Sequence, residues 1–237
     1  MESIQIQVLL WSLLWEIINI ENNERYSYLW CRRLRERGCM LNKSHKREKS
    51  DLESSWIFDD NAFLKGTNNE YGEILGGVNE LNDWEKEISI ILAIGSPKTL
   101  KLITDKIANI NVTFPNIISP DAIFLDKNNL ILGKGNLICT GCLISCNVRI
   151  GDFNCLNDFV SIGHDTVIGN YNSFMTATRI SGIVSIGSYN YFGVNSSVLQ
   201  EIKIGNETTI AAGSAVMRRT KDGYTYIGIP ASALVIK

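Results

Sequence analysis

A large apolar residue recurs at every sixth position through the C-terminal half of the chain. With 45% hydrophobic residues overall, an unbroken series of this length has a chance probability on the order of 10⁻⁵. A period of six predicts a β-helix in which each hexad is a short strand plus a corner, and three hexads form one triangular coil. The apolar residues then stack inside as a continuous core. The series consists of Leu132, Ile138, Ile144, Ile150, Leu156, Ile162, Ile168, Phe174, Ile180, Ile186, Phe192, Val198, Ile204, Ile210 and Val216.

Glycine directly follows the apolar residue in many hexads. Glycine at this place predicts a sharp corner that has no room for a side chain. These glycines are Gly133, Gly151, Gly163, Gly169, Gly187, Gly193 and Gly205.

The repeat contains one histidine, His164, two residues after an inward position and therefore on the outside of the predicted prism. Asp165 follows it, and an imidazole with a carboxylate partner is suited to act as a general base near neutral pH. Exposed His–Asp neighbours are also common in purely structural settings. One coil beyond His164 is Gly182, which leaves space above the imidazole for a thioester and offers an N–H to an oxyanion. One coil before it is Cys146, which we interpret as structural because direct transfer requires only a base.

Four cysteines lie close together in the sequence, and Cys139 and Cys142 form a C-x-x-C pair that suggests zinc. Cys139, Cys142, Cys146 and Cys155 occupy four different places within their hexads, so we expect their side chains to leave the coil in different directions. The sequence therefore predicts no metal site, and free cysteines are typical of a reducing compartment.

The N-terminal half reads as an α/β domain. The apolar run Ile88–Ile94 predicts a buried parallel strand, and Lys98–Ile107 has helical spacing after a Ser96 cap and Pro97. Residues 56–58 predict another strand, ending at Asp59 and Asp60. Carboxylates at the carboxyl end of a parallel strand commonly hold a nucleotide's hydroxyls or base, although two solvated turn acids fit the same pattern.

Charge and composition narrow the choice of partners. A formal net charge of −2 disfavours nucleic acid, which is bound through many cationic contacts. The apolar stretch from Ile4 to Ile20 contains Gln5, Gln7 and Glu16 and lacks a basic start or cleavage site, so we expect neither a membrane span nor a signal peptide.

Two features of the first 55 residues are unusual. The first glycine is Gly38, so no glycine-rich phosphate turn follows a strand at Gln5–Leu10. Residues 31–55 are dense in basic side chains and have little apolar periodicity, which a solvated or disordered insert and a shifted reading frame would each explain.

From about Ile57 onward the sequence resembles the left-handed β-helix acyltransferases with hexapeptide repeats, in particular bacterial sugar-nucleotide N-acetyltransferases and sialic acid O-acetyltransferase-like proteins. The segments that carry the resemblance are Phe58-Asp59-Asp60, residues 91–96, Asn157, Ile162-Gly163-His164-Asp165, Ser181-Gly182 and residues 227–231.

The resemblance implies a Rossmann-like sugar-nucleotide domain over residues 1–115, with an incomplete glycine loop, followed by a left-handed parallel β-helix over 116–237. It implies a cytoplasmic homotrimer of bacterial surface-glycan biosynthesis that transfers an acetyl group from acetyl-CoA to an amino group of a nucleotide-linked amino sugar. His164 would be the base and Asp165 would raise its basicity; some relatives have Glu at that place. The resemblance assigns substrate contacts to Asp59, Asp60, Gly95 and Asn157, and acetyl-CoA contacts to Ser173, Gly182, Val194 and Ala212.

Three points stay open on the sequence. Some relatives carry a second histidine where this chain has Ser173. An O-acetyltransferase acting on sialic acid, another sugar or serine would need no nucleotide pocket, which fits the missing glycine turn. A non-catalytic trimeric scaffold would retain the same repeat.

Overall fold

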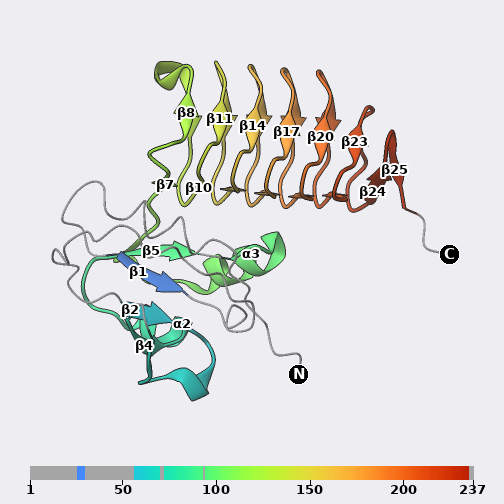
Figure 1. Cartoon of the computed structure of the whole chain (residues 1–237). Coiled ribbons are helices and arrows are strands. Elements are labelled where there is room, and N and C mark those ends of the chain that lie inside the picture. Colours follow the sequence, from blue (N-terminus) through green and yellow to red (C-terminus); the bar gives the residue numbers. More distant parts are fainter. Residues whose placement is uncertain (1–25, 30–55, 70–71, 93, 235–237) are drawn as a thin grey trace, which may run out of the picture. The chain divides into compact units, whose positions relative to one another are not determined.

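The structure is a computed structural model that describes residues 26–29, 56–69, 72–92 and 94–234. The described residues form two compact units, one up to Gly95 together with Thr99–Pro115, the other Ser96–Lys98 together with Asn116 onward (Figure 1). The expectations for Ile4–Ile20, Gln5–Leu10 and residues 31–55 lie outside the described residues. Within the described ranges, no helix has the length and apolar character needed to cross a membrane.

The first unit is built on a six-stranded sheet in the order β3-β4-β2-β1-β5-β6. All neighbouring strands pair parallel except β3 and β4, which pair antiparallel. The sequence analysis correctly placed the strand at residues 56–58 and the strand and helix that follow residue 88. The elements are β1 (Tyr26–Leu29), β2 (Trp56–Phe58), η1 (Ala62–Leu64), β3 (Asn68–Asn69), β4 (Gly72–Gly76), α2 (Val78–Asn82), β5 (Ile88–Leu92), α3 (Pro97–Lys106) and β6 (Val112–Thr113).

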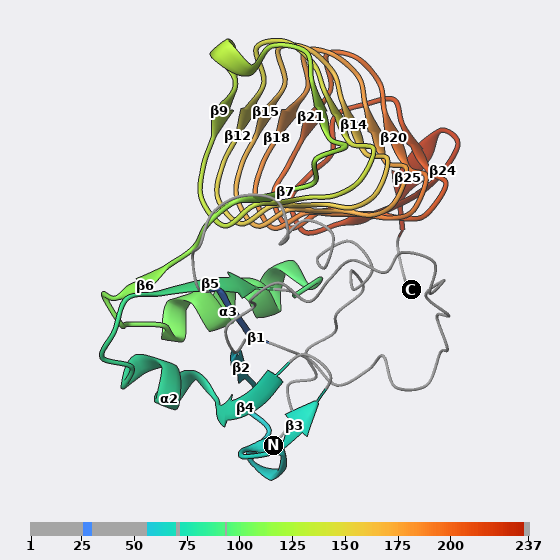
Figure 2. The ribbon, with the colours of Figure 1, turned by 60° about the vertical axis from the view of Figure 1, so that its left-hand side comes forward.

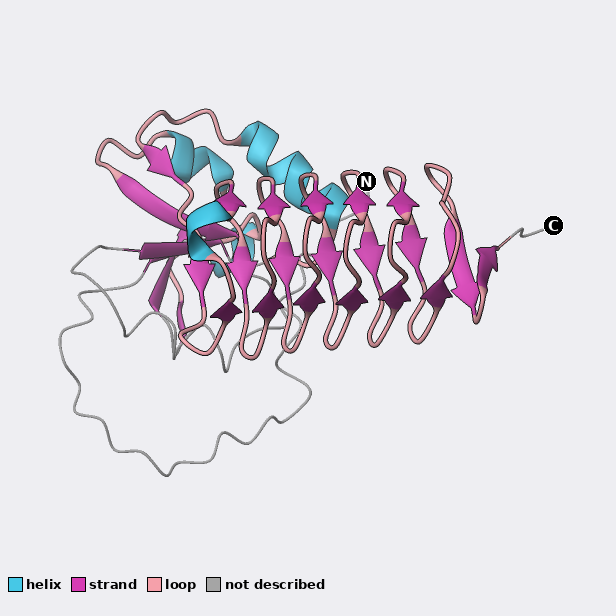
Figure 3. Cartoon of the chain, turned by 90° about the horizontal axis from the view of Figure 1, so that it is seen from above, coloured by secondary structure: helices cyan, strands magenta, loops and turns pink. Residues whose placement is uncertain are grey.

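The second unit is a parallel β-helix with three sheets, visible as three rows of short strands in Figures 2 and 3. The first sheet contains β7 (Ile117–Ile118), β10 (Leu137–Ile138), β13 (Cys155–Leu156), β16 (Ser173–Phe174), β19 (Tyr191–Phe192), β22 (Thr209–Ile210), β24 (Thr225–Gly228) and β25 (Ala231–Ala233). The second contains β8 (Ile123–Phe124), β11 (Leu143–Ile144), β14 (Ser161–Ile162), β17 (Arg179–Ile180), β20 (Ser197–Val198) and β23 (Ala215–Val216). The third contains β9 (Ile131–Leu132), β12 (Arg149–Ile150), β15 (Val167–Ile168), β18 (Ser185–Ile186) and β21 (Lys203–Ile204).

The strand register follows the predicted three-hexad coil. Leu143 pairs with Ser161, 18 residues further on, and the same spacing continues along the sheets. Ile123 instead pairs with Leu143, 20 residues further on, because the short helix η2 (Lys127–Asn129) lengthens the first coil. The β-helix therefore begins before Leu132, at β7, with one irregular coil that the strict count of six did not detect.

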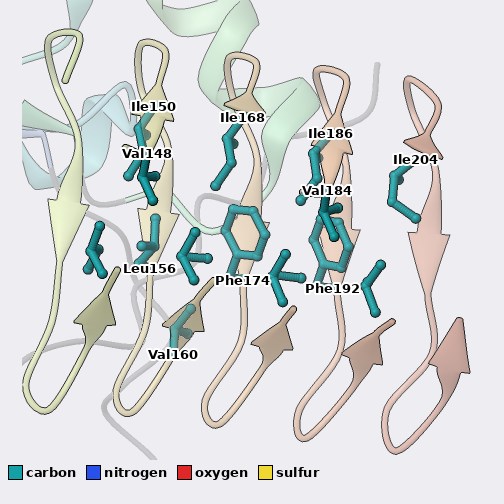
Figure 4. Packing of buried hydrophobic residues seen from close by; sticks show 14 of the residues in the cluster. Val148, Ile150, Leu156, Val160, Ile168, Phe174, Val184, Ile186, Phe192 and Ile204 are labelled. Atoms are coloured by element: carbon teal, nitrogen blue, oxygen red, sulfur yellow. The ribbon is translucent and has the colours of Figure 1, made fainter. Parts of the chain in front are cut away.

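The predicted inward residues form the core, and every one from Ile138 to Val216 is buried. Figure 4 shows them stacked between coils, with Phe174 directly against Phe192; the two ring centroids are 4.6 Å apart and nearly parallel. A second inward position lies four residues after the first. It holds Val148, Val160 and Val184 in the same cluster.

At one corner of the prism this second inward position holds asparagine. The side-chain Oδ1 of Asn154 accepts hydrogen bonds from the backbone N–H of Asn172 at 2.9 Å and from its Nδ2 at 2.9 Å. The pattern repeats from Asn136 to Asn190, all of which are buried. The ladder satisfies buried backbone donors that the strands leave unpaired, and the apolar period gave no sign of it.

The corner glycines act through contact between coils. A Cβ on Gly163 would lie 2.4 Å from the backbone carbon of Ser181, so the close approach of two coils excludes a side chain there. The left-handed residue of each corner stands two places later, with φ between 51° and 64° from Asn147 to Glu207. Most of these positions carry a side chain, so glycine at the predicted place is not explained by left-handed backbone.

Three of the four neighbouring cysteines are buried, and only Cys146 is exposed. Burial raises the pKa of Cys142 to about 11 and that of Cys155 to about 12, and it raises the pKa of Cys139 as well. Of the three buried cysteines, only Cys142 belongs to the core cluster inside the prism. Cys139 and Cys155 are buried outside that cluster, so the expectation that the side chains leave the coil in different directions is not contradicted. Among the described residues, no group of His, Cys, Asp and Glu is arranged to hold a metal ion.

Candidate active site

His164 lies on the corner that joins β14 to β15, and the backbone of this corner is held from both sides. The N–H of Asp165 donates to the carbonyl of Cys146 in the coil before at 3.0 Å. The carbonyl of His164 accepts from the N–H of Ile183 in the coil after at 2.8 Å. The position of the imidazole therefore depends on the side chain alone, because neighbouring coils fix the main chain.

Asp165 orients the imidazole. His164 Nδ1 lies 2.8 Å from Asp165 Oδ2, and Asn147 Nδ2 donates to the other oxygen, Oδ1, at 2.6 Å. The hydrogen bond from His164, followed by the one from Asn147, lowers the pKa of the Asp165 carboxyl below its usual range. An ionised carboxylate only accepts hydrogen bonds, so the imidazole proton belongs on Nδ1 and the lone pair on Nε2.

The imidazole ring of His164 packs against Gly182. A Cβ built on Gly182 would lie 2.5 Å from Nε2, 2.7 Å from Cε1 and 2.9 Å from Cδ2 of His164, over the face of the ring. The imidazole itself therefore occupies the space that glycine leaves open, which the sequence analysis had expected to be free for a thioester. No hydrogen bond from the Gly182 N–H is present in the described part of the chain, and the same holds for the N–H of His164 at the equivalent place one coil before. His164 Nε2 and the Gly182 N–H are thus both without a hydrogen-bond partner among the described residues. About half of the His164 side chain is exposed, so a substrate can reach it.

The other expected acetyl-CoA residues lie elsewhere on the prism. Val194 and Ala212 are both exposed and lie in successive coils, on the corner that leads from the first sheet to the second. His164 and Gly182 lie on the corner that leads from the second sheet to the third. Ser173 belongs to β16 and is 1% exposed. Within a single chain, Gly182 is therefore the one residue of the four expected acetyl-CoA contacts that lies beside His164.

Asn157 is buried and its side chain is used within the fold. Its Nδ2 donates to the carbonyl of Phe174 at 3.0 Å, and its own carbonyl accepts from the Cys142 thiol at 3.0 Å. The residue is 5% exposed, so the described contacts are those of a residue that joins two coils.

The expected nucleotide residues meet at one edge of the first unit's sheet. Strands β2 and β5 both pair parallel to β1, and Leu29 is in register with Phe58 and with Leu92. Their carboxyl ends therefore share an edge, which places Asp59 and Asp60 on the same edge as Gly95.

Both carboxylates at this edge already stabilise local structure. Asp59 is buried, and its Oδ1 accepts from the N–H of Asn61 at 2.8 Å. Asp60 is exposed, and its Oδ1 accepts from the N–H of Val78 at 2.8 Å, at the start of α2. The alternative of two solvated turn acids therefore fits Asp60, whereas Asp59 is a buried turn acid. The second oxygen of the exposed Asp60 is still available to a ligand.

Asn147 is the site residue that the sequence analysis did not identify. It lies one coil before Asp165, and the regular spacing of the repeat would have placed it there. The missing signal was the side-chain pairing itself, because a period of six says which residues stack and not which of them exchange hydrogen bonds.

The fold has clear relatives among solved structures. A variant of perosamine N-acetyltransferase from Caulobacter crescentus, in complex with CoA and GDP-perosamine, is 24% identical with a TM-score of 0.68, covering 76% of this chain and 84% of that one. The acetyltransferase domain of PglB from Neisseria gonorrhoeae, in complex with acetyl coenzyme A, is 23% identical with a TM-score of 0.68 and coverages of 75% and 86%. WeeI from Acinetobacter baumannii is 23% identical with a TM-score of 0.69 and coverages of 76% and 85%.

The chain has the fold of the hexapeptide-repeat sugar acetyltransferases. Its parallel β-helix matches the left-handed β-helix of such acetyltransferases. No protein-family model and no curated protein matches the sequence. At this level of identity the relatives establish the fold of the chain.

Proposed function

We propose that the protein transfers an acetyl group from acetyl-CoA to the amino group of a nucleotide-linked amino sugar, with His164 as the general base. The observation that carries the proposal is the half-exposed imidazole of His164, whose Nδ1 is held by Asp165 and whose ring packs at Nε2 against Gly182. The structural relatives support it, since the perosamine N-acetyltransferase was crystallised with CoA and a GDP-linked sugar. By the same analogy, the product would serve bacterial surface-glycan synthesis in the cytoplasm.

The proposed reaction needs one base and one oxyanion donor. The acceptor amine attacks the thioester carbonyl carbon, and His164 Nε2 takes the proton that the nitrogen loses. The carbonyl oxygen becomes an oxyanion, and the free N–H of Gly182 donates to it. Collapse of the tetrahedral intermediate breaks the C–S bond, and the imidazolium returns its proton to the departing thiolate. Asp165 stabilises the imidazolium between the two proton transfers, so no covalent enzyme intermediate is needed.

The separation of the expected cofactor residues favours a homotrimer as the working form. Val194 and Ala212 lie on a different corner from His164 within one chain. A donor molecule that touches both sets is therefore best placed between the His164 corner of one copy and the Val194 corner of a second. Closed cyclic assembly around a threefold axis would produce equivalent sites. We include this arrangement in the proposal.

Thiol release from acetyl-CoA tests the proposal across a panel of UDP-, GDP- and dTDP-linked amino sugars, sialic acid and serine. We expect turnover with an amino-sugar nucleotide, and His164→Ala should reduce kcat by roughly 10² to 10⁴-fold. Asn128→Ala is the control, because Asn128 is an exposed residue of η2, two coils before His164 on the same edge of the prism. If turnover occurs only with sialic acid or serine, the acceptor is a hydroxyl and not an amine. If no acceptor leads to thiol release, the proposed enzymatic activity is wrong.

To test whether the sheet edge with Asp60 binds the sugar nucleotide, a variant is needed that does not disturb the fold. Asp60→Asn retains an Oδ1 acceptor for the Val78 N–H while removing the negative charge. A raised KM for the sugar nucleotide with unchanged KM for acetyl-CoA supports the nucleotide site. An unchanged KM for both substrates removes Asp60 from the proposal.

A further inference from the structure

The hydrogen bonds around Asp165 extend one coil further than a histidine–carboxylate pair requires. The carboxylate has two oxygens with different partners: Oδ2 faces His164 Nδ1 at 2.8 Å, and Oδ1 faces Asn147 Nδ2 at 2.6 Å. All three side chains project from the same corner of the prism, Asn147 from the coil before. Only the amide nitrogen of Asn147 can donate to a carboxylate, so the orientation of the amide is determined by Asp165.

The exposure of the pair makes this third residue important. The side chains of His164 and Asp165 are 51% and 48% exposed, so packing does not hold the carboxylate in one rotamer. Water competes for both of its oxygens. A donor fixed to the neighbouring coil restricts rotation of the carboxylate and leaves Oδ2 facing the ring. Charge-assisted hydrogen bonds of this length are among the stronger ones.

The backbone explains why asparagine can occupy this place. Asn147 and Asp165 have φ values of 56° and 55°, a left-handed conformation that asparagine and aspartate tolerate better than most residues. Both Cα–Cβ bonds therefore leave the corner in the same way, one above the other. Successive left-handed corners thus bring a donor and an acceptor within hydrogen-bonding reach, so that one polar side chain orients the next.

We propose that Asn147 is a positioning residue for the general base: its amide orients Asp165, which in turn holds the Nδ1–H tautomer of His164 and presents Nε2 to the substrate. The inference rests on the proposed acetyl transfer for its kinetic consequence. Its structural part concerns the imidazole itself and is measurable without any acceptor.

A double-mutant cycle tests the kinetic part. Asn147→Gly removes the amide and suits the left-handed backbone, and we expect it to lower kcat about 3- to 10-fold with no change in KM for acetyl-CoA. In an Asp165→Ala background the same change should have less than about a 1.5-fold effect, because Asn147 acts only through Asp165. Asn147→Asp keeps the shape but exchanges a donor for a like charge, so kcat should fall at least as far.

The tautomer of His164 provides the second measurement. The chain has two histidines, so ¹⁵N-histidine NMR resolves them, and His164→Ala assigns the signal. The wild-type protein should show the Nδ1–H form with slow proton exchange, and Asn147→Gly should show a mixed tautomer with faster exchange. Asn195→Gly is the matched stability control, because Asn195 is exposed, has φ 55° and donates no side-chain hydrogen bond in the described part of the chain.

The outcomes separate this inference from the proposed function. If the wild-type protein releases no thiol with any acceptor, acetyl transfer fails, and the NMR comparison alone decides the role of Asn147. If the wild-type protein is active and Asn147→Asp retains full kcat, only the volume of the side chain matters and the positioning role is overturned. Equal kcat losses with and without Asp165, or an unchanged tautomer in Asn147→Gly, overturn it as well.

Discussion

Replacing Gly182 by alanine is the sharpest test of the geometry at the His164 corner. The added Cβ would lie 2.5 Å from Nε2, 2.7 Å from Cε1 and 2.9 Å from Cδ2 of His164. Ordinary contact between such atoms begins near 3.5 Å, so the ring has to retreat by about 1 Å. Gly182 does not have a left-handed φ, so alanine adds a steric conflict without backbone strain.

The expected consequence is a loss of rate with little loss of stability. Displacement of a catalytic group by about 1 Å costs on the order of 10²-fold in rate, which corresponds to about 2.7 kcal/mol of transition-state stabilisation. The imidazole is half exposed and can rotate into solvent. The steric conflict is therefore relieved by movement of the His164 side chain, and the backbone keeps its position. We expect the melting temperature of Gly182→Ala to stay within about 2 °C of the wild-type value.

Gly163→Ala is the matched comparison from the coil before. Its Cβ would meet backbone atoms, 2.4 Å from Ser181 C and 2.5 Å from Gly182 N, and backbone in a hydrogen-bonded ladder cannot move aside as a side chain can. This variant should lose stability, which thermal unfolding measures directly. Kinetics with acetyl-CoA and the best acceptor then complete the comparison. If Gly182→Ala keeps wild-type kcat, the ring does not work in the position described, and contact with Gly182 does not set the position of the base.

Three further predictions concern burial and charge. Asn172→Ala should destabilise the β-helix by about 2–4 kcal/mol, because it leaves buried donors of the next coil unpaired. Chemical denaturation measures the loss, with Asn128→Ala as the control. Equal stability of the two variants would contradict the prediction. Iodoacetamide at pH 8 should modify the exposed Cys146 much faster than Cys142, whose pKa burial raises to about 11, and peptide mass spectrometry measures the order. The carboxyl of Asp165 should titrate below the ordinary aspartate value of about 3.9, because its pKa is lowered by His164 and Asn147. The contribution of the ionised carboxylate to stability is present above the ordinary value and is lost as the pH falls through the lowered pKa. A ¹³C NMR titration that gives a pKa of about 3.9 or more for Asp165 would contradict the prediction.

The sequence predicted the repeat, the stacking and the central pair because each depends on a regular spacing. One inward residue per hexad is enough to fix the phase of the coil, and the phase alone places Gly182 over His164. The strand at residues 56–58 and the helix after Pro97 were equally local: an apolar run and a capping sequence define them without reference to distant residues.

The irregular parts of the fold were missed for the same reason. The first coil contains η2 and two extra residues, so a strict count of six could not reach β7. Burial of Cys139 and Cys155 was not predicted either, because both are buried outside the core cluster that the period defines. The second inward position four residues on was visible only once the corners were formed.

What the sequence by itself determined is which residues lie above one another, since the backbone period sets the stacking of Cα atoms. The tertiary structure decided which stacked polar groups exchange hydrogen bonds, because that depends on side-chain rotamers and on the left-handed corners that aim them. The pairing of Asn147 with Asp165 and the buried ladder around Asn154 are both of this kind.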